Sequence, residues 1–150
     1  FLGINREGRI SIVKTTGNTD VHMVLRGGND KPNYKSADIA QVMEKLAKSK
    51  IETSIMVDCS HANSYKDHTR QEGVMNDVID QVAAGNGQIG SLMIESFLEE
   101  GNQKMADKLE DLAYGVSITD KCVNWETTER MLRHAHAKLK ECGGRNLPVK

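Results

Sequence analysis

Residues 54–59 read Ser-Ile-Met-Val-Asp-Cys, a short apolar run bounded on both sides by polar residues. Two runs of the same kind flank it in the sequence, Val21–Leu25 and Ile89–Ile94. Short aliphatic runs without polar alternation are typical of strands that are buried on both faces. The chain therefore carries three candidate strands for the interior of one sheet.

A helical pattern follows each of the three runs. We expect Ser36 to cap a first helix whose apolar residues recur at helical spacing as far as Leu46. Residues 71–84 and 127–141 show the same amphipathic spacing, and residues 96–124 between them form a long irregular segment. Alternation of buried strands with amphipathic helices predicts an α/β fold with a parallel sheet.

The first 15 residues differ from this pattern. Phe1–Ile4 and Arg9–Thr15 are β-prone and flank a turn-like segment, which predicts a β-hairpin. The later runs repeat about every 35 residues, a period that suits a barrel or a doubly wound sheet. Three parallel strands leave two open edges, and a complete barrel needs eight strands. We therefore expect residues 16–150 to form the C-terminal part of a (β/α)8 TIM barrel, about strands six to eight, with the rest missing or on another chain.

Composition limits the classes of function. The 150 residues carry a formal net charge of −1, which argues against nucleic-acid binding. No apolar run approaches the roughly 20 residues that span a bilayer, so no membrane partner is expected. Three cysteines without close spacing indicate neither a disulfide framework nor a zinc knuckle, and they favour a cytoplasmic setting.

Polar residues follow the three predicted strands where each ends, namely Arg26, His61 and Glu95. The carboxyl ends of parallel strands form the edge where α/β folds bind ligands. Asp120, after the long segment, is a fourth candidate. An imidazole with two carboxylates suits one divalent metal ion of the Mn, Fe, Co or Zn type. The alternatives are a histidine bonded within its loop, a solvated Glu95 and a helix-capping Asp120.

Two further features carry competing interpretations. Arg26-Gly27-Gly28 combines a guanidinium, which matches phosphate or carboxylate, with glycines that let backbone approach an anion. The alternative is a left-handed turn beside a surface arginine. Cys59 shares a strand face with His61 and could join it at a metal ion. A buried apolar cysteine is the favoured reading.

Five motifs occur in an order found in one known family. They are Leu25–Gly28 with Pro32–Tyr34, Asp58–Ser64, Met93–Ser96 with Glu100–Gln103, Tyr114–Asp120, and Trp125–Thr128. In these motifs the chain resembles the type I 3-deoxy-D-arabino-heptulosonate 7-phosphate (DAHP) synthases, which catalyse the first step of the shikimate pathway. The resemblance covers nearly the whole chain.

The resemblance implies a (β/α)8 barrel and a divalent metal held by Cys, His, Glu and Asp. Three of these ligands match His61, Glu95 and Asp120, and the arginine that holds the phosphoenolpyruvate phosphate matches Arg26. The family's ligand cysteine lies upstream of the matched region, so Cys59 does not correspond to it. The Lys-Pro-Arg-Thr motif that clamps both substrates also lies upstream. This chain alone is therefore expected to be inactive.

The implied reaction joins phosphoenolpyruvate, erythrose 4-phosphate and water, and releases DAHP and phosphate. An aromatic amino acid inhibits the family by feedback, and Phe1 and Gly3 match the hairpin that helps form that regulatory site. Glycine at this position favours tyrosine as the effector. The resemblance also implies a homo-oligomer, a dimer or tetramer. The alternative is an inactive half-barrel or binding module that needs an N-terminal partner chain.

Overall fold

Three parallel strands form the centre of the computed structural model, which describes residues 1–29 and 31–145. The sheet has the order β3-β4-β5, built from β3 (Met23–Leu25), β4 (Ile55–Asp58) and β5 (Ile89–Met93). Val57 lies opposite Leu25 on one side and Leu92 on the other. Each predicted run contains one strand, so the expected α/β architecture with a parallel sheet is confirmed.

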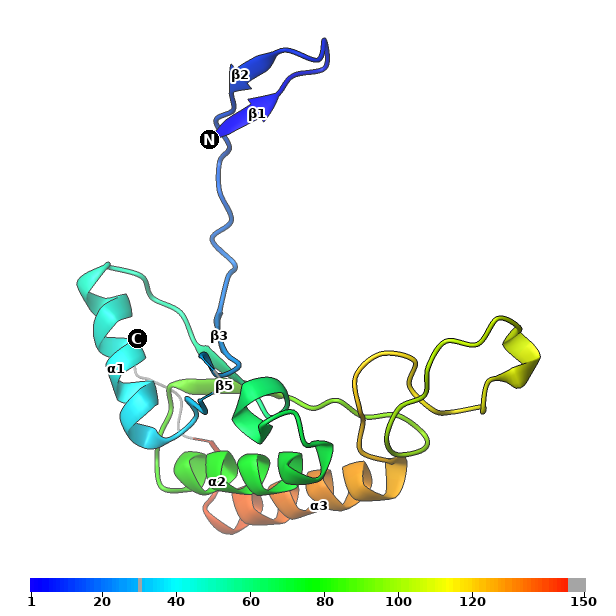
Figure 1. The fold of residues 1–150 in the computed structure, drawn as a ribbon. Coiled ribbons are helices and arrows are strands. Elements are labelled where there is room, and N and C mark those ends of the chain that lie inside the picture. Colours follow the sequence, from blue (N-terminus) through cyan, green and yellow to red (C-terminus); the bar gives the residue numbers. More distant parts are fainter. Residues whose placement is uncertain (30, 146–150) are drawn as a thin grey trace.

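Three helices accompany the sheet, α1 (Ser36–Lys48), α2 (Gln71–Ala83) and α3 (Trp125–Glu141). Figure 1 shows α2 and α3 side by side, and these two helices pack together. One continuous apolar core joins the strands to the helices. Its members in and next to the strands are Leu25, Ile55, Val57, Cys59 and Ile89, and its helical members include Ile39, Val74, Val78, Met131 and Ala135.

The starts of two helices differ from the prediction. Ser36 is the first residue of α1 rather than its cap, and Lys35 takes the capping position. The N–H of Lys35 donates to the Asp38 carboxylate at 3.2 Å, so the side chain of the third helical residue satisfies the backbone N–H of the capping position. Helix α3 begins two residues before the predicted start because the Asn124 side chain accepts the N–H of Thr127.

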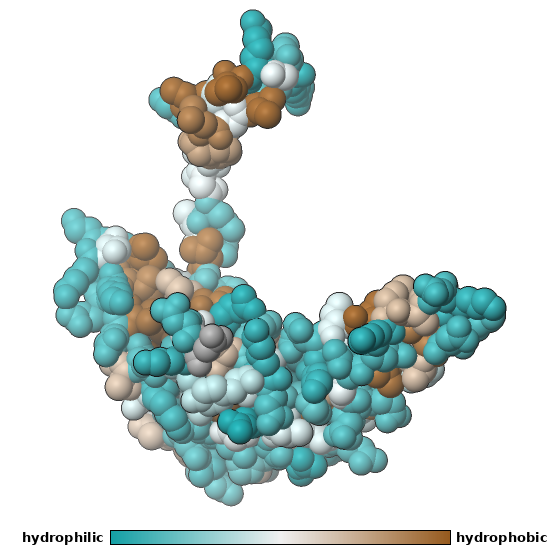
Figure 2. All heavy atoms as spheres, in the orientation of Figure 1, coloured by the Kyte–Doolittle hydropathy of each residue, from teal (hydrophilic) through white to brown (hydrophobic). Residues whose placement is uncertain are grey.

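The predicted hairpin is present as β1 (Leu2–Ile4) and β2 (Ile10–Ile12), which pair antiparallel. It stands away from the sheet at the end of an extended segment (Figure 1). Leu2, Ile4, Ile10 and Ile12 share one face of the hairpin, and each is at least 73% exposed. Figure 2 shows these side chains as a hydrophobic cluster in the upper part of the view. A two-stranded hairpin is marginally stable by itself, so this face is suited to contact another surface.

The segment between Ser96 and Asn124 is irregular, as expected. It holds one 3-10 turn, Leu109–Asp111, and a few isolated bridges, among them a parallel one between Ser96 and Val123. No helix within residues 1–29 and 31–145 is long and apolar enough to cross a bilayer.

Candidate metal centre

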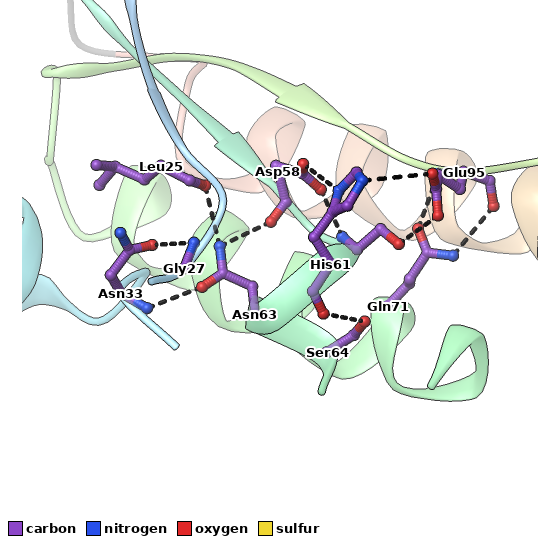
Figure 3. Close-up of polar contacts among 10 residues, drawn as sticks. Leu25, Gly27, Asn33, Asp58, His61, Asn63, Ser64, Gln71 and Glu95 are labelled. Carbon is purple, nitrogen blue, oxygen red and sulfur yellow. Dashed lines mark hydrogen bonds and ion pairs between the residues drawn. The ribbon is translucent and has the colours of Figure 1, made fainter. Parts of the chain in front are cut away.

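His61 lies at the tight turn that follows β4. Asp58, the last strand residue, is only 2% exposed. Its Oδ1 accepts the N–H of Ser60 at 2.8 Å, and its Oδ2 lies 2.6 Å from His61 Nδ1 (Figure 3). His61 has a φ of 48°, in the left-handed region that few residues other than glycine adopt. Such backbone strain persists where surrounding contacts hold it, and it is concentrated at functional sites.

Glu95 follows β5 and is held through its backbone and its side chain. Gln71, which is fully buried, accepts the N–H of Glu95 at 2.8 Å and donates to the Glu95 carbonyl at 3.0 Å (Figure 3). Ser60 Oγ donates to Glu95 Oε2 at 2.5 Å. The remaining carboxylate oxygen, Oε1, lies 3.7 Å from His61 Nε2. Helix α2 and the β4 turn together aim Glu95 at His61.

Asp120 reaches the same place from the irregular segment and is exposed. Its neighbours are anchored through backbone atoms. Gly101 and Cys122 exchange backbone hydrogen bonds of 2.9 and 3.1 Å, and Asn102 donates to the Thr119 carbonyl at 2.7 Å. Asp120 therefore lies on a loop that hydrogen bonds hold on both sides of it.

The predicted triad converges. One ligand atom from each of His61, Glu95 and Asp120 lies within 4.8 Å of the other two. Nitrogen and oxygen ligands sit about 2.0–2.2 Å from a zinc-type ion and therefore about 3.0–3.5 Å from one another. The observed limit of 4.8 Å is wider than this, so a bound ion would require the three side chains to move closer together. The donor set of one imidazole and two carboxylates fits a divalent ion of intermediate hardness.

Arg26 lies beside this cluster but is not part of it. Its carbonyl accepts the N–H of Ala62 at 3.2 Å, which ties the end of β3 to the His61 turn. Gly27 adopts a φ of 77°, and a Cβ there would lie 2.5 Å from the Ala62 Cβ, so the close approach requires glycine. The Arg26 side chain is exposed and makes no ion pair with the described residues. It is free to bind an anion at this edge.

Two asparagines complete the connection between the strand ends. Asn63 Nδ2 donates to the carbonyls of Leu25 and Asp58 at 3.0 and 2.8 Å. Asn63 Oδ1 accepts the N–H of Asn33, and Asn33 Oδ1 accepts that of Gly27 (Figure 3). The buried Asn63 thus fixes the spacing between Arg26 and His61.

The cysteines stand outside the cluster. Cys59 is fully buried in the core, and burial, with a smaller contribution from the Asp58 charge, raises the pKa of its thiol to about 12. This supports the reading of Cys59 as a buried apolar residue. Burial also raises the pKa of Cys122, opposed by a hydrogen bond from Ser117 and reinforced by the charges of Glu95 and Asp120.

Sequence reasoning missed the residues that hold the ligands in place, namely Asp58, Ser60, Asn63 and Gln71. Asp58 could have been identified from the sequence, because a carboxylate inside an apolar run needs a hydrogen-bond partner when it is buried. Gln71 could not, since a glutamine at the start of an amphipathic helix is ordinary. Phe1 and Gly3 lie on the hairpin, away from the cluster (Figure 1).

Comparison with known proteins agrees with the motifs. The model of the DAHP synthetase I family matches residues 2–133. The chain is 45% identical over 139 residues to the Tyr-sensitive phospho-2-dehydro-3-deoxyheptonate aldolase of Enterobacter agglomerans, covering 93% of this chain and 65% of that protein. It is 46% identical over 133 residues to the Phe-sensitive enzyme of Escherichia coli, covering 89% of this chain and 37% of that protein.

A solved structure gives the same result. The phospho-2-dehydro-3-deoxyheptonate aldolase of Francisella tularensis superposes with a TM-score of 0.79 at 41% identity, covering 93% of this chain and 40% of that one. The chain thus spans less than two thirds of the length of these relatives. The match to the family model extends over most of the chain, and the chain belongs to the DAHP synthetase I family.

Proposed function

We propose that this chain supplies the metal-binding and phosphate-binding edge of a DAHP synthase. The reaction is the condensation of phosphoenolpyruvate with erythrose 4-phosphate and water to give DAHP and phosphate, the first step of the shikimate pathway. The observation that carries the proposal is the convergence of His61, Glu95 and Asp120 within 4.8 Å at the carboxyl ends of the strands. A cytoplasmic location belongs to the proposal and is supported by the three free cysteines.

In this proposal residues 16–150 are the C-terminal part of a (β/α)8 barrel, and residues 1–15 belong to a regulatory element. The open sheet supports it. Val24, on the sheet face opposite the apolar core, is 41% exposed, whereas a parallel sheet is normally covered on both faces. The outer edge of β3 also lacks a neighbouring strand among the described residues. Further strands of an N-terminal remainder would cover both.

The residues of the edge have distinct roles. His61, Glu95 and Asp120 hold one divalent ion of the Mn, Fe, Co or Zn type, which when bound polarises a carbonyl or a water molecule. Arg26 holds the phosphate of phosphoenolpyruvate through its guanidinium fork. Asn63 and Gly27 keep that arginine at a fixed distance from His61, so that the two reactants meet in one orientation.

The same proposal makes the isolated chain inactive. The family's fourth metal ligand, a cysteine, and its Lys-Pro-Arg-Thr substrate clamp do not correspond to any residue matched here. Cys122, two residues after Asp120, is not grouped with the three ligands. The alternative function is an inactive half-barrel fragment or binding module that requires an N-terminal partner chain, and the open sheet edge does not distinguish it from the synthase proposal.

The hairpin is proposed to bind an aromatic amino acid through Phe1 and Gly3. Its exposed apolar face also suits a homo-oligomer, a dimer or tetramer. Related proteins are named Tyr-, Phe- and Trp-sensitive at 42–46% identity, so overall identity does not select the effector. Gly3 favours tyrosine. A Cβ at position 3 would lie 2.8 Å from Val13 Cγ2, so Gly3→Ser must displace the Val13 side chain and is expected to change effector preference in inhibition assays.

Phosphate release from phosphoenolpyruvate plus erythrose 4-phosphate, with Mn²⁺ added, tests the enzyme proposal. The chain is assayed alone and together with the N-terminal half of a related synthase. Activity is expected only in the mixture and is expected to disappear in His61→Ala. Full activity of His61→Ala in the mixture would overturn the ligand assignment. Metal-dependent binding without turnover in the mixture would favour the binding module.

A further inference from the structure

We infer that Asp58 is the positioning residue of this site. It fixes the tautomer of His61 and, through Ser60, the direction of the Glu95 carboxylate. The inference rests on the proposed metal centre. It assigns a role to Asp58 and Ser60, which do not bind the metal ion themselves.

The first step concerns the His61 ring. Asp58 Oδ2 lies 2.6 Å from Nδ1, and an ionised carboxylate can only accept a hydrogen bond. Nδ1 is therefore the nitrogen that donates to Asp58, and Nε2 is the ring nitrogen left for a metal ion. Nε2 faces Glu95 Oε1 at 3.7 Å, which is too long for a hydrogen bond. A cation between them satisfies both, as expected for a metal-binding histidine whose other nitrogen is bonded to a carboxylate.

The second step leads from Asp58 to Glu95. Asp58 Oδ1 accepts the N–H of Ser60 at 2.8 Å, which fixes the turn and the place of the Ser60 hydroxyl. That hydroxyl donates to Glu95 Oε2 at 2.5 Å and leaves Oε1 on the His61 side. One carboxylate thus orients two ligands that are 34 residues apart in the sequence.

The third step is the rigidity of Asp58 itself. Its side chain is 2% exposed, and its carbonyl accepts Asn63 Nδ2 at 2.8 Å. The next residue, Cys59, donates its N–H to the Met93 carbonyl at 2.9 Å and so ties the turn to β5. A buried, fully bonded group holds its neighbours in one geometry. Asp58 therefore keeps His61 and Glu95 at fixed positions relative to the sheet.

Asp67 provides a matched control. Like Asp58, it accepts the backbone N–H of the residue two positions later, Thr69, at 3.1 Å. Unlike Asp58, it is only half-buried and contacts Thr69 and Arg70 rather than a metal ligand. Asp67→Asn therefore removes a charge from the same kind of turn without touching the proposed site.

The direct test is the tautomer of His61 in the metal-free chain, read from ¹⁵N chemical shifts of the imidazole. Wild type and Asp67→Asn are expected to show the Nδ1–H form. In Asp58→Asn the carboxamide can donate to Nδ1, and the ring is expected to change to the Nε2–H form. An Nε2–H form in wild type would overturn the inference without the need for any variant.

Calorimetric titration with Co²⁺ alone gives the second readout. Asp58→Asn is expected to weaken binding by about 10–100-fold, and Ser60→Ala by about tenfold with the His61 tautomer unchanged. Asp67→Asn is expected to bind like wild type. Unchanged affinity in both Asp58→Asn and Ser60→Ala would overturn the inference while leaving the metal centre intact. Absence of Co²⁺ binding in wild type would instead contradict the proposed metal centre.

Discussion

Two segments bring metal ligands to the same place, one as a buried turn and the other as an exposed loop. The β4 turn, residues 58–64, carries His61, and the β5 loop, residues 96–124, carries Asp120. In the β4 turn Asp58, Ser60, Asn63 and Ser64 are all less than 5% exposed. In the β5 loop Asp120 is exposed, and several large apolar side chains face solvent, Tyr114 at 90% exposure among them.

The difference shows that the proposed site combines a rigid, buried segment with an exposed one. Buried polar groups are costly unless they are hydrogen-bonded, so the β4 turn has one favourable arrangement. An exposed carboxylate has water as a partner in every arrangement, so the β5 loop carries no such penalty. We expect the β4 turn to determine where a metal ion binds. Asp120, on the β5 loop, is expected to add a ligand from the solvent side.

Thiol labelling should separate the two segments most strongly. Cys59 is fully buried within the β4 turn with a pKa raised to about 12, whereas Cys122 in the β5 loop is partly accessible and Cys142 is exposed. With iodoacetamide at pH 8, Cys142 is expected to react first and Cys122 second. Cys59 is expected to react at least about a thousandfold more slowly than Cys142, because it must wait for unfolding. Mass spectrometry of the peptides measures this, and labelling of Cys59 at the rate of Cys122 would contradict a rigid β4 turn.

Two glutamines test whether hydrogen bonds in the buried segment contribute more to the free energy of unfolding than those in the exposed one. Gln71 bonds both backbone groups of Glu95 from a fully buried position. Gln103 bonds the Ala113 and Val116 backbone within the β5 loop, where it is partly exposed. Gln71→Leu is expected to lower the free energy of unfolding by about 2–4 kcal/mol, because buried backbone groups lose their partners. Gln103→Leu is expected to cost less than about 1.5 kcal/mol, since water replaces the bonds. Urea unfolding measures both, and equal losses would refute the comparison.

Asp120→Asn tests the outer ligand. We expect Co²⁺ affinity to fall by about tenfold or more, which corresponds to about 1.4 kcal/mol of binding free energy. The free energy of unfolding of the metal-free chain should change by less than about 0.5 kcal/mol, because the carboxylate is exposed. Lys121→Gln is the control, being a neighbouring exposed residue outside the cluster. A large loss of stability in Asp120→Asn would show that the β5 loop is as constrained as the β4 turn.

The smallest effect is expected from the ion pair beside Gln71. The Arg130 guanidinium hydrogen-bonds the Glu72 carboxylate at 3.0 and 2.8 Å and lowers the pKa of that carboxyl. A carboxyl whose folded pKa is depressed contributes stability above its unfolded pKa and loses it as pH falls through the folded pKa. The loss of stability in Arg130→Gln at pH 7 should therefore be the smallest of these effects, because solvent screens the exposed pair, and the difference should vanish under acid conditions. A loss that persists unchanged at low pH would point to packing instead of charge.

Much of the fold was predictable from particular residues. The aliphatic runs around Leu25, Val57 and Leu92 marked the three strands, and the spacing in residues 71–84 marked α2 to within one residue. Helix starts were less certain, as Ser36 and Asn124 show. Capping depends on which nearby side chain reaches the free N–H groups, and several polar residues compete for that role.

The sequence by itself determined the strands, their order, the polar residues at their ends and the family. Apolar periodicity and motif order are properties of the chain, readable without knowing what touches what. Only the tertiary structure decided that Asp58 holds His61, that Ser60 reaches Glu95 and that Gln71 clamps the Glu95 backbone. The reason is physical: a buried polar group bonds whatever the packed sheet and helices bring within about 3 Å, and sequence separation does not limit that choice.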